Sequence, residues 1–253
     1  VKNRKHFIEN MLDNSVAFFN SNDCYPVSAD TTLPFEQHRD LFYLSGINQE
    51  ETVLLIYKNN NSNYEEILFL TKPNDLLTHW EGERLNKEKA FFISGIKTVY
   101  WLEQIDDIIK KIMQNVNILY LNKNEHYRAK VETETREKRF NNWIKKEYAS
   151  KDLKGSNSIL QKLRSVKDPI EIELIQKACD ITEKGFRRVL NFVKPGVWEY
   201  EIEAEFSHEF LRNRSKKFAY SPIIASGKNS TILHYVDNNN QCLDGDVLLL
   251  DVG

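Results

Sequence analysis

The feature that most constrains how this chain can fold is an apolar run near its C-terminus, Val247–Leu250, which ends at the carboxylate of Asp251. A strand that is apolar on both faces is typical of the inside of a covered sheet, with a neighbouring strand on each side. The sequence stops at Gly253 and offers no later strand to pair with this one. We therefore expect the chain to be the front portion of a larger protein, whose further residues complete this domain.

Asp251 is also the first candidate functional residue. A carboxylate at the end of a buried strand costs free energy unless another group compensates its charge, so Asp251 either binds a cation or caps the turn that follows. His234 lies in an earlier apolar segment, Ile232–Tyr235, and the two side chains could meet at one wall of a cleft. A lone histidine in an apolar segment is more often a core residue bonded to the backbone, and the residues alone leave these alternatives open.

The composition excludes several classes of function. The 253 residues are enough for one large domain or two of ordinary size. The net charge is −2, from 35 basic and 37 acidic residues, which does not favour nucleic-acid binding. No apolar run approaches the roughly 18 residues that span a bilayer, and the basic N-terminus lacks the apolar segment of a secretory signal. Cys24, Cys179 and Cys242 lie far apart, which predicts a cytoplasmic protein without disulfides.

The first half of the sequence predicts a small α/β domain. His6–Phe19 begins as an amphipathic helix, and its last residues, Ser15–Phe19, already have strand character. Val53–Tyr57 and Glu66–Leu70 are apolar strands on either side of an asparagine-rich turn, which predicts a hairpin. The remaining predicted elements are a helix over Trp101–Met113, a strand over Val116–Leu121, and a charged, solvated helix or excursion over Glu125–Tyr148.

The second half predicts an α+β arrangement. The composition turns polar and small at Lys151–Ser158, so we expect one domain over residues 1–155 and another over residues 156–253. Asp168-Pro169 predicts a helix start, because an N-cap acid is followed by proline at the first helical position, and Lys194–Gly196 ends that helix. Its predicted core-facing stripe comprises Ile170, Leu174, Ile175, Ala178, Ile181, Phe186, Val189 and Leu190. Further predicted elements are a helix over Tyr200–Arg212 and strands around Ile223, around Ile232 and over Val247–Asp251.

Several short motifs, in their order and spacing, resemble a known family. Those near the C-terminus are Gly227-x-Asn229, Leu233-His234-Tyr235, Gly245-Asp246 and Leu250-Asp251-x-Gly253. Together they resemble the metal-dependent creatinase/aminopeptidase family, which has the pita-bread fold, and Leu163–Ile172 looks like the segment that opens that domain. Leu41–Ile47, Glu51–Leu54 and Trp80–Leu85 resemble the N-terminal domain of aminopeptidase P. The fold class implied is an α/β creatinase-like N-terminal domain followed by an incomplete α+β pita-bread domain.

The resemblance implies a site that binds two divalent metal ions, usually Mn²⁺, through two aspartates, one histidine and two glutamates. Only the first aspartate, Asp251, lies in this sequence, so the site is incomplete in these residues and activity of the 253-residue piece itself is in doubt. His234 matches a histidine that donates a hydrogen bond to the substrate carbonyl or the tetrahedral intermediate. Tyr220 matches a residue that lines the substrate pocket, and Trp80 resembles a tryptophan that reaches the active site of a neighbouring subunit. Core packing is the alternative role for Tyr220 and Trp80.

The activity implied by this resemblance is that of an Xaa-Pro aminopeptidase, which hydrolyses the bond between an N-terminal residue and a following proline. The resemblance also implies a homo-oligomer, either a dimer or a tetramer. One alternative is a prolidase that acts on Xaa-Pro dipeptides. Another is a non-catalytic interaction module, such as the pita-bread domain in the large subunit of the histone chaperone FACT. The presence of both His234 and Asp251 favours an enzyme.

Overall fold

The computed structural model of the chain contains two compact units, Val1–Val166 and Lys167–Gly253, which we call the N-terminal and C-terminal units and describe separately. The structure describes residues 1–29, 31–61, 63–74, 78, 82–126 and 132–253. Trp80 lies outside these residues. The domain boundary expected after residue 155 falls at the end of strand β8 (Asp152–Gly155), which pairs with the sheet of the N-terminal unit. The polar composition there marks an edge strand, and the N-terminal unit continues to Val166.

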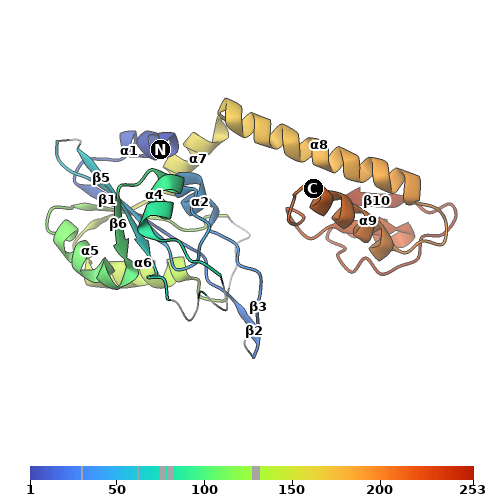
Figure 1. Cartoon of the computed structure of the whole chain (residues 1–253), viewed down its shortest axis with the longest axis horizontal. Helices are drawn as coiled ribbons and strands as arrows, with labels where there is room; N and C mark the ends of the chain where they lie inside the picture. Colours follow the sequence, from blue (N-terminus) through green and yellow to red (C-terminus); the bar gives the residue numbers. More distant parts are fainter. Residues whose placement is uncertain (30, 62, 75–77, 79–81, 127–131) are drawn as a thin grey trace. The chain divides into compact units, whose positions relative to one another are not determined.

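The N-terminal unit is built on a six-stranded sheet with the strand order β6-β5-β4-β1-β7-β8 (Figure 1). Its central strand, β1, pairs antiparallel with β4 and parallel with β7. The predicted hairpin is confirmed, because β4 and β5 pair antiparallel with Val53 opposite Phe69. The strands are β1 (Ser15–Asn20), β4 (Val53–Lys58), β5 (Tyr64–Leu70), β6 (Thr98–Trp101) and β7 (Ile118–Leu121), and a separate two-stranded ribbon is formed by β2 (Pro26–Ser28) and β3 (Thr31–Thr32).

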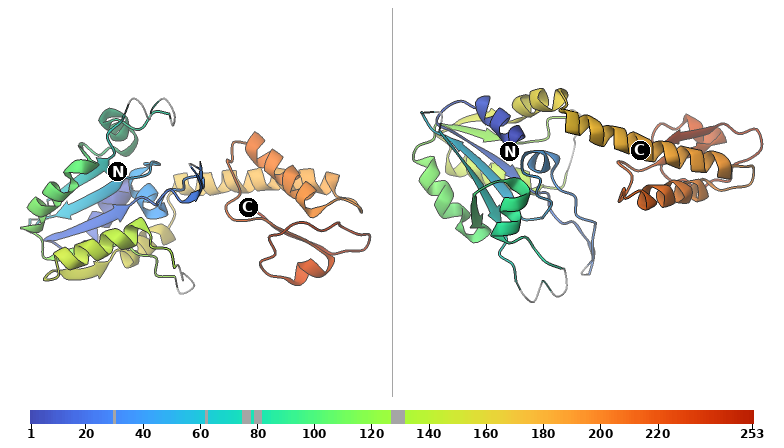
Figure 2. Two further views of the ribbon diagram at one scale, coloured as in Figure 1. Left: turned by 90° about the horizontal axis from the view of Figure 1, so that it is seen from below. Right: turned by 45° about the horizontal axis from the view of Figure 1, so that its top comes forward.

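Helices cover both faces of this sheet (Figure 2). The alternation of side chains along β1 explains why there are two apolar clusters, since Ala17 and Phe19 pack in one and Val16 and Phe18 in the other. The helices that contribute to the first cluster are α1 (Lys2–Glu9), α2 (Arg39–Ser45), α4 (Lys87–Ser94) and α7 (Asn157–Ser165), and those of the second are α5 (Ile105–Met113) and α6 (Arg136–Glu147).

Three sequence predictions for this unit are wrong in part. The helix predicted to start at His6 ends at Glu9, whereas the strand character predicted for Ser15–Phe19 is confirmed by the fully buried central strand β1. Trp101 ends strand β6 and does not begin a helix; α5 starts after the 3₁₀ turn Leu102–Gln104. The charged segment predicted to be solvated contains α6, whose apolar residues pack on the sheet: Phe140, Trp143 and Ile144.

Arg4 connects three elements of the N-terminal unit from a buried position on α1. Its guanidinium donates to Leu44 O at 2.6 Å and to Ser94 O at 2.8 Å, and these carbonyls belong to the last turns of α2 and α4. It also forms an ion pair with Glu66 on β5 at 2.9 Å. Because the carboxyl ends of helices carry partial negative charge and unpaired carbonyls, one guanidinium satisfies both helix ends.

Replacing Arg4 with methionine should therefore destabilise the N-terminal unit by about 3–5 kcal/mol, since the partly buried Glu66 and two helix-end carbonyls would lose their donor. Urea denaturation followed by near-ultraviolet circular dichroism measures the loss. Lys5→Met, at an exposed position on the same helix, should change the unfolding free energy by less than about 0.5 kcal/mol. Equal losses in the two variants would contradict this role for Arg4.

Glu137 on α6 is a buried carboxyl with an unusual protonation equilibrium. It accepts hydrogen bonds from Asn20 Nδ2 at 2.9 Å and from the Asn20 backbone N–H at 3.4 Å. Loss of hydration raises the pKa of Glu137 to about 8, because the bonds from Asn20 and the charge of Arg136 only partly offset the burial. The carboxyl is therefore neutral in the folded unit at pH values where it is ionised in the unfolded chain.

The contribution of Glu137 to the unfolding free energy of the N-terminal unit should consequently be most favourable below about pH 4.5. It should fall by a few kcal/mol as the pH rises towards 8. Glu137→Gln removes the titration and should flatten that fall, which urea denaturation at a series of pH values would measure. Glu147→Gln, at the exposed end of α6, should leave the pH dependence as in the wild type. A Glu137→Gln profile parallel to the wild type would be inconsistent with this assignment.

The C-terminal unit packs two helices against a two-stranded sheet (Figure 2). Helix α8 (Pro169–Phe192) begins as predicted, since Asp168 is its N-cap and donates its backbone N–H to Glu171 Oε2 at 2.8 Å. Helix α9 (Glu199–Arg212) lies against it at Gly185, where a Cβ atom would come within 2.8 Å of the Phe206 ring. The remaining elements are strand β9 (Ile223–Ser226), the 3₁₀ turn η2 (Gly227–Thr231) and strand β10 (Leu248–Asp251), which pairs antiparallel with β9.

Two predictions for the C-terminal unit are wrong in part. Only the second half of the α8 stripe packs in the core, through Ile181, Phe186 and Val189. The other large apolar residues of the stripe are exposed: Ile170, Leu174, Ile175 and Leu190. The predicted strand around Ile232 is an exposed turn after η2, and β10 is half-exposed because within these residues it has one neighbouring strand. Among the described residues, the structure contains no helix of the length and apolarity that crossing a bilayer requires.

Candidate functional site

Asp251 and Tyr220 are brought together at the end of β10. Tyr220 Oη donates to Asp251 Oδ1 at 2.5 Å, although Tyr220 lies in the bend before β9, 31 residues earlier in the sequence. The backbone holds them in place, because Ala219 N–H donates to Gly253 O at 2.7 Å and so ties the Tyr220 segment to the residues after β10. Both side chains are exposed. The structure thus places two of the predicted site residues in direct contact.

The hydrogen bond between Tyr220 and Asp251 affects the protonation of the phenol and leaves one carboxylate oxygen open. Donation to Asp251 raises the pKa of the Tyr220 phenol, with smaller contributions from burial and from the negative charge of Asp251. The phenol therefore remains a donor at neutral pH. No described residue donates a hydrogen bond to the second oxygen of Asp251, Oδ2. An exposed carboxylate with one oriented oxygen and one open oxygen is a suitable ligand for a hard divalent cation.

His234 lies in the exposed turn that follows η2, and its imidazole forms no hydrogen bond or ion pair with a described residue. The next residue, Tyr235, is buried and packs with Ile223 and Ala225 of β9. The structure therefore positions His234 only through the backbone on which it lies. Within the described residues, no hydrogen bond or ion pair joins His234 to the Tyr220–Asp251 pair.

Below this turn lies a buried carboxylate that the sequence analysis did not identify. Glu199, the first residue of α9, is fully buried and accepts hydrogen bonds from Ser226, Tyr235 and Asn240. Burial alone would raise the pKa of Glu199, but these hydrogen bonds outweigh it and hold the pKa below its usual value. An acidic residue at a helix start is so common that the local pattern does not distinguish Glu199 from an ordinary helix-capping acid.

The described residues contain no group of three or more histidine, cysteine, aspartate or glutamate side chains arranged to hold a metal ion. Asp251 can therefore supply one ligand to a cation, and further ligands would have to come from outside the described part of the chain. The remaining predicted site residue, Trp80, lies outside the described residues.

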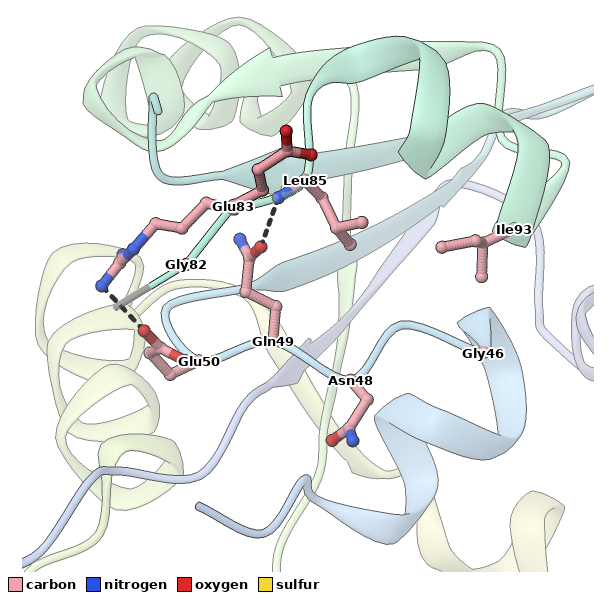
Figure 3. Close-up of a pocket in the computed structure, with 9 residues that line it drawn as sticks. Gly46, Asn48, Gln49, Glu50, Gly82, Glu83, Leu85 and Ile93 are labelled. Carbon is pink, nitrogen blue, oxygen red and sulfur yellow. Dashed lines mark hydrogen bonds and ion pairs between the residues drawn. The ribbon is translucent and has the colours of Figure 1, made fainter. Parts of the chain in front are cut away.

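A cavity of about 340 Å³ lies in the N-terminal unit, where the end of α2 faces the segment before α4 (Figure 3). Arg84 pairs with Glu50 at 2.8 Å, and Gln49 Oε1 accepts from the Leu85 N–H at 2.7 Å. Its lining residues are Gly46, Asn48, Gln49, Glu50, Gly82, Glu83, Arg84, Leu85 and Ile93. The charged groups at this cavity are already paired, and it contains neither His234 nor Asp251, so we do not assign the candidate site to it.

Two family models match the chain, one in each half. The model described as the aminopeptidase P N-terminal domain matches residues 1–120, and the model of metallopeptidase family M24 matches residues 173–253. An Xaa-Pro aminopeptidase from Haemophilus influenzae is 32% identical over 224 residues, which make up 88% of this chain and 50% of the relative.

Solved structures agree with these matches. A putative aminopeptidase P from Bacillus anthracis superposes with a TM-score of 0.92 at 31% identity, covering 100% of this chain and 60% of that one. Zinc-substituted aminopeptidase P from Escherichia coli, in complex with product, gives a TM-score of 0.87 at 25% identity and 57% coverage of its chain. The chain thus spans about half the length of the curated relatives it matches.

The turn that leads into the His234 segment depends on a glycine. Gly227 has φ +52°, and a Cβ atom there would lie 2.9 Å from Asp246 Oδ1. Asp246 cannot easily move, because its other oxygen accepts from the Leu243 N–H at 2.9 Å. Gly245 has φ +85° but no atom within 4 Å of the same position, so it offers a matched control.

Gly227→Ala should destabilise the C-terminal unit by about 1–3 kcal/mol more than Gly245→Ala does, because both variants have the backbone strain but only the first has the collision. The comparison is made by thermal or urea unfolding of the two variants beside the wild type. Equal losses of unfolding free energy would show that the contact with Asp246 relaxes without cost.

Proposed function

We propose that this chain, which belongs to metallopeptidase family M24 and carries an aminopeptidase P N-terminal domain, is the front part of an Xaa-Pro aminopeptidase. Such an enzyme hydrolyses the bond between an N-terminal residue and a following proline. The relatives named Xaa-Pro aminopeptidase support this activity. The fold prediction is confirmed, since an α/β N-terminal domain is followed by the first part of a pita-bread domain. The structural observation that carries the proposal is the Tyr220–Asp251 pair at the end of β10.

Asp251 is the residue of this chain that we propose as a metal ligand. A pair of divalent cations supplies Lewis-acid catalysis when bound in a peptidase site of this kind. Mn²⁺ is the proposed metal, because carboxylate oxygens suit hard cations. The remaining ligands would come from the part of the relatives' length that this chain does not span.

The residues of this chain have separate tasks in the proposed reaction. Tyr220 donates to Asp251 Oδ1 and so holds the carboxylate with Oδ2 free. His234 donates a hydrogen bond to the substrate carbonyl oxygen, where negative charge develops in the transition state. A proline after the scissile bond has no N–H to recognise, so its ring must be recognised by shape, and the Tyr220 ring is the proposed apolar wall.

The finer features of the protein are also proposals. We propose a cytoplasmic homo-oligomer, a dimer or tetramer, in which Trp80 reaches the site of a neighbouring subunit. The cysteines are consistent with a reducing compartment, because Cys24, Cys179 and Cys242 all have free thiols and the first two are exposed. Peptides with proline at the second position are the proposed substrates.

The test uses the full polypeptide that contains this chain, loaded with Mn²⁺ and given a peptide that begins Xaa-Pro. His234→Ala should lower kcat by about 10²–10³-fold, because the transition state loses a hydrogen-bond donor. His208→Ala, at an exposed position on α9, is the matched control and should retain wild-type activity. Asp251→Asn should lower the metal content measured by mass spectrometry.

Each alternative gives a different result in this assay. Cleavage of Xaa-Pro dipeptides in preference to longer peptides would indicate a prolidase. A metal-loaded polypeptide that cleaves neither substrate would indicate a non-catalytic module. Full activity in His234→Ala would remove the role proposed for that residue while leaving the peptidase assignment in place.

A further inference from the structure

The carboxylate of Glu199 has all of its hydrogen-bonding capacity occupied. Oε1 accepts from the backbone N–H and the hydroxyl of Ser226, both at 2.7 Å. Oε2 accepts from Tyr235 Oη at 2.7 Å and from the Asn240 N–H at 2.9 Å. Four donors match the four acceptor positions of an ionised carboxylate, which explains how the charge of a fully buried Glu199 is tolerated.

These donors come from both ends and the middle of one segment. Ser226 is the last residue of β9, Tyr235 follows His234 directly, and Asn240 lies where the segment returns to α9. The return is also fixed by the backbone, because the Glu199 N–H donates to Asn240 O at 2.9 Å. Glu199 therefore attaches the whole segment 226–240 to the first turn of α9 at one point.

A carboxylate is required at this position, and an amide would not replace it. Two of the four donors are backbone N–H groups, which cannot reverse and accept a hydrogen bond. A glutamine at position 199 would direct its NH₂ group at one of these backbone N–H groups. The NH₂ group and the N–H group would then face each other without an acceptor in a buried place. The carboxylate also lies at the positive end of the α9 dipole, which favours the ionised form.

We propose that Glu199 is a positioning residue for His234, acting through the hydroxyl of Tyr235. The His234 imidazole has no hydrogen bond to a described residue, so only its backbone determines where it meets a substrate. The bond from Tyr235 to Glu199 fixes that backbone at the adjacent residue. This inference rests on the proposed function, because positioning has a kinetic effect only if His234 assists the reaction. A small misplacement of a catalytic group is enough to lower a rate substantially.

Tyr235→Phe in the Mn²⁺-loaded full polypeptide tests the proposal. The ring stays in its apolar contact with Ile223 and Ala225, and only the hydroxyl is lost, which donates to Glu199 at 2.7 Å and makes longer hydrogen bonds with Asn239 in the same segment. We expect kcat for an Xaa-Pro peptide to fall by roughly 10- to 100-fold with KM changed less than about threefold. Tyr200→Phe, on the exposed aromatic next to Glu199, is the matched control and should show wild-type kinetics.

A double-mutant cycle separates positioning from a general structural effect. In a His234→Ala background, Tyr235→Phe should cause no further fall in kcat, because the group that it positions is already absent. The same fold-loss in both backgrounds would overturn the proposal, and so would a wild-type kcat in Tyr235→Phe. If the wild-type polypeptide itself cleaves no Xaa-Pro peptide, the proposed function has failed, and that result is distinct from a failure of the cycle.

A second measurement needs no activity and uses the 253-residue chain. Amide hydrogen exchange of residues 227–240 should be faster in Tyr235→Phe than in the wild type, whereas exchange in the N-terminal unit should not change. Glu199→Asp keeps the charge and should restore part of the protection that Glu199→Gln loses. Unchanged exchange in Tyr235→Phe would show that Glu199 does not hold the segment through that hydroxyl, and would overturn the proposal independently of catalysis.

Discussion

The arrangement of the C-terminal unit depends on the cost of removing one carboxylate from water. Glu199 is fully buried at the start of α9, and it stays ionised only because the segment 226–240 folds over it and supplies four donors. The same donors would be unsatisfied if the segment opened, so helix and segment hold each other in place. Strand β9 precedes this segment and pairs with β10, which ends at Asp251. The pairing of β9 with β10 thus supports Asp251, and the buried Glu199 supports the segment that carries His234, so each holds one part of the proposed site.

Three carboxyl groups of this chain show how the environment determines whether a carboxyl group can still bind a cation. Glu137 is buried, Asn20 is the one described residue that donates to it, and its pKa rises to about 8. Glu199 is buried with four donors, and its pKa falls. Asp251 is exposed, receives one hydrogen bond and keeps an open oxygen. An exposed carboxylate such as Asp251 retains the capacity to bind a cation. Glu137 is protonated at neutral pH, and the lone pairs of Glu199 are all occupied by hydrogen bonds within the fold.

The sequence predicted features that depend on local chemistry and missed those that depend on distant contacts. The start of α8 at Asp168-Pro169 and the hairpin of β4 and β5 follow from neighbouring residues, and both were predicted. The strand character of Ser15–Phe19 was visible in the sequence, but its central place in the sheet depends on pairing with β4 and β7, which are distant in sequence. Glu199 was missed for the same reason, since its partners Ser226, Tyr235 and Asn240 are distant in sequence. The roles of His234, Tyr220 and Asp251 come from motif resemblance and remain proposals.

The Tyr220–Asp251 bond also bears on how the proposed metal site could assemble. A lone exposed carboxylate gains little from a divalent cation, because the cation must lose water for a single ligand. Several ligands share that cost only if each is already oriented when the cation arrives. Tyr220 supplies such orientation for Asp251 through residues of this chain alone, and Ala219 and Gly253 fix the backbone around it. Asp251, the proposed first ligand, is therefore arranged by the fold before the others are needed, which would lower the entropy lost when a complete site binds its metal.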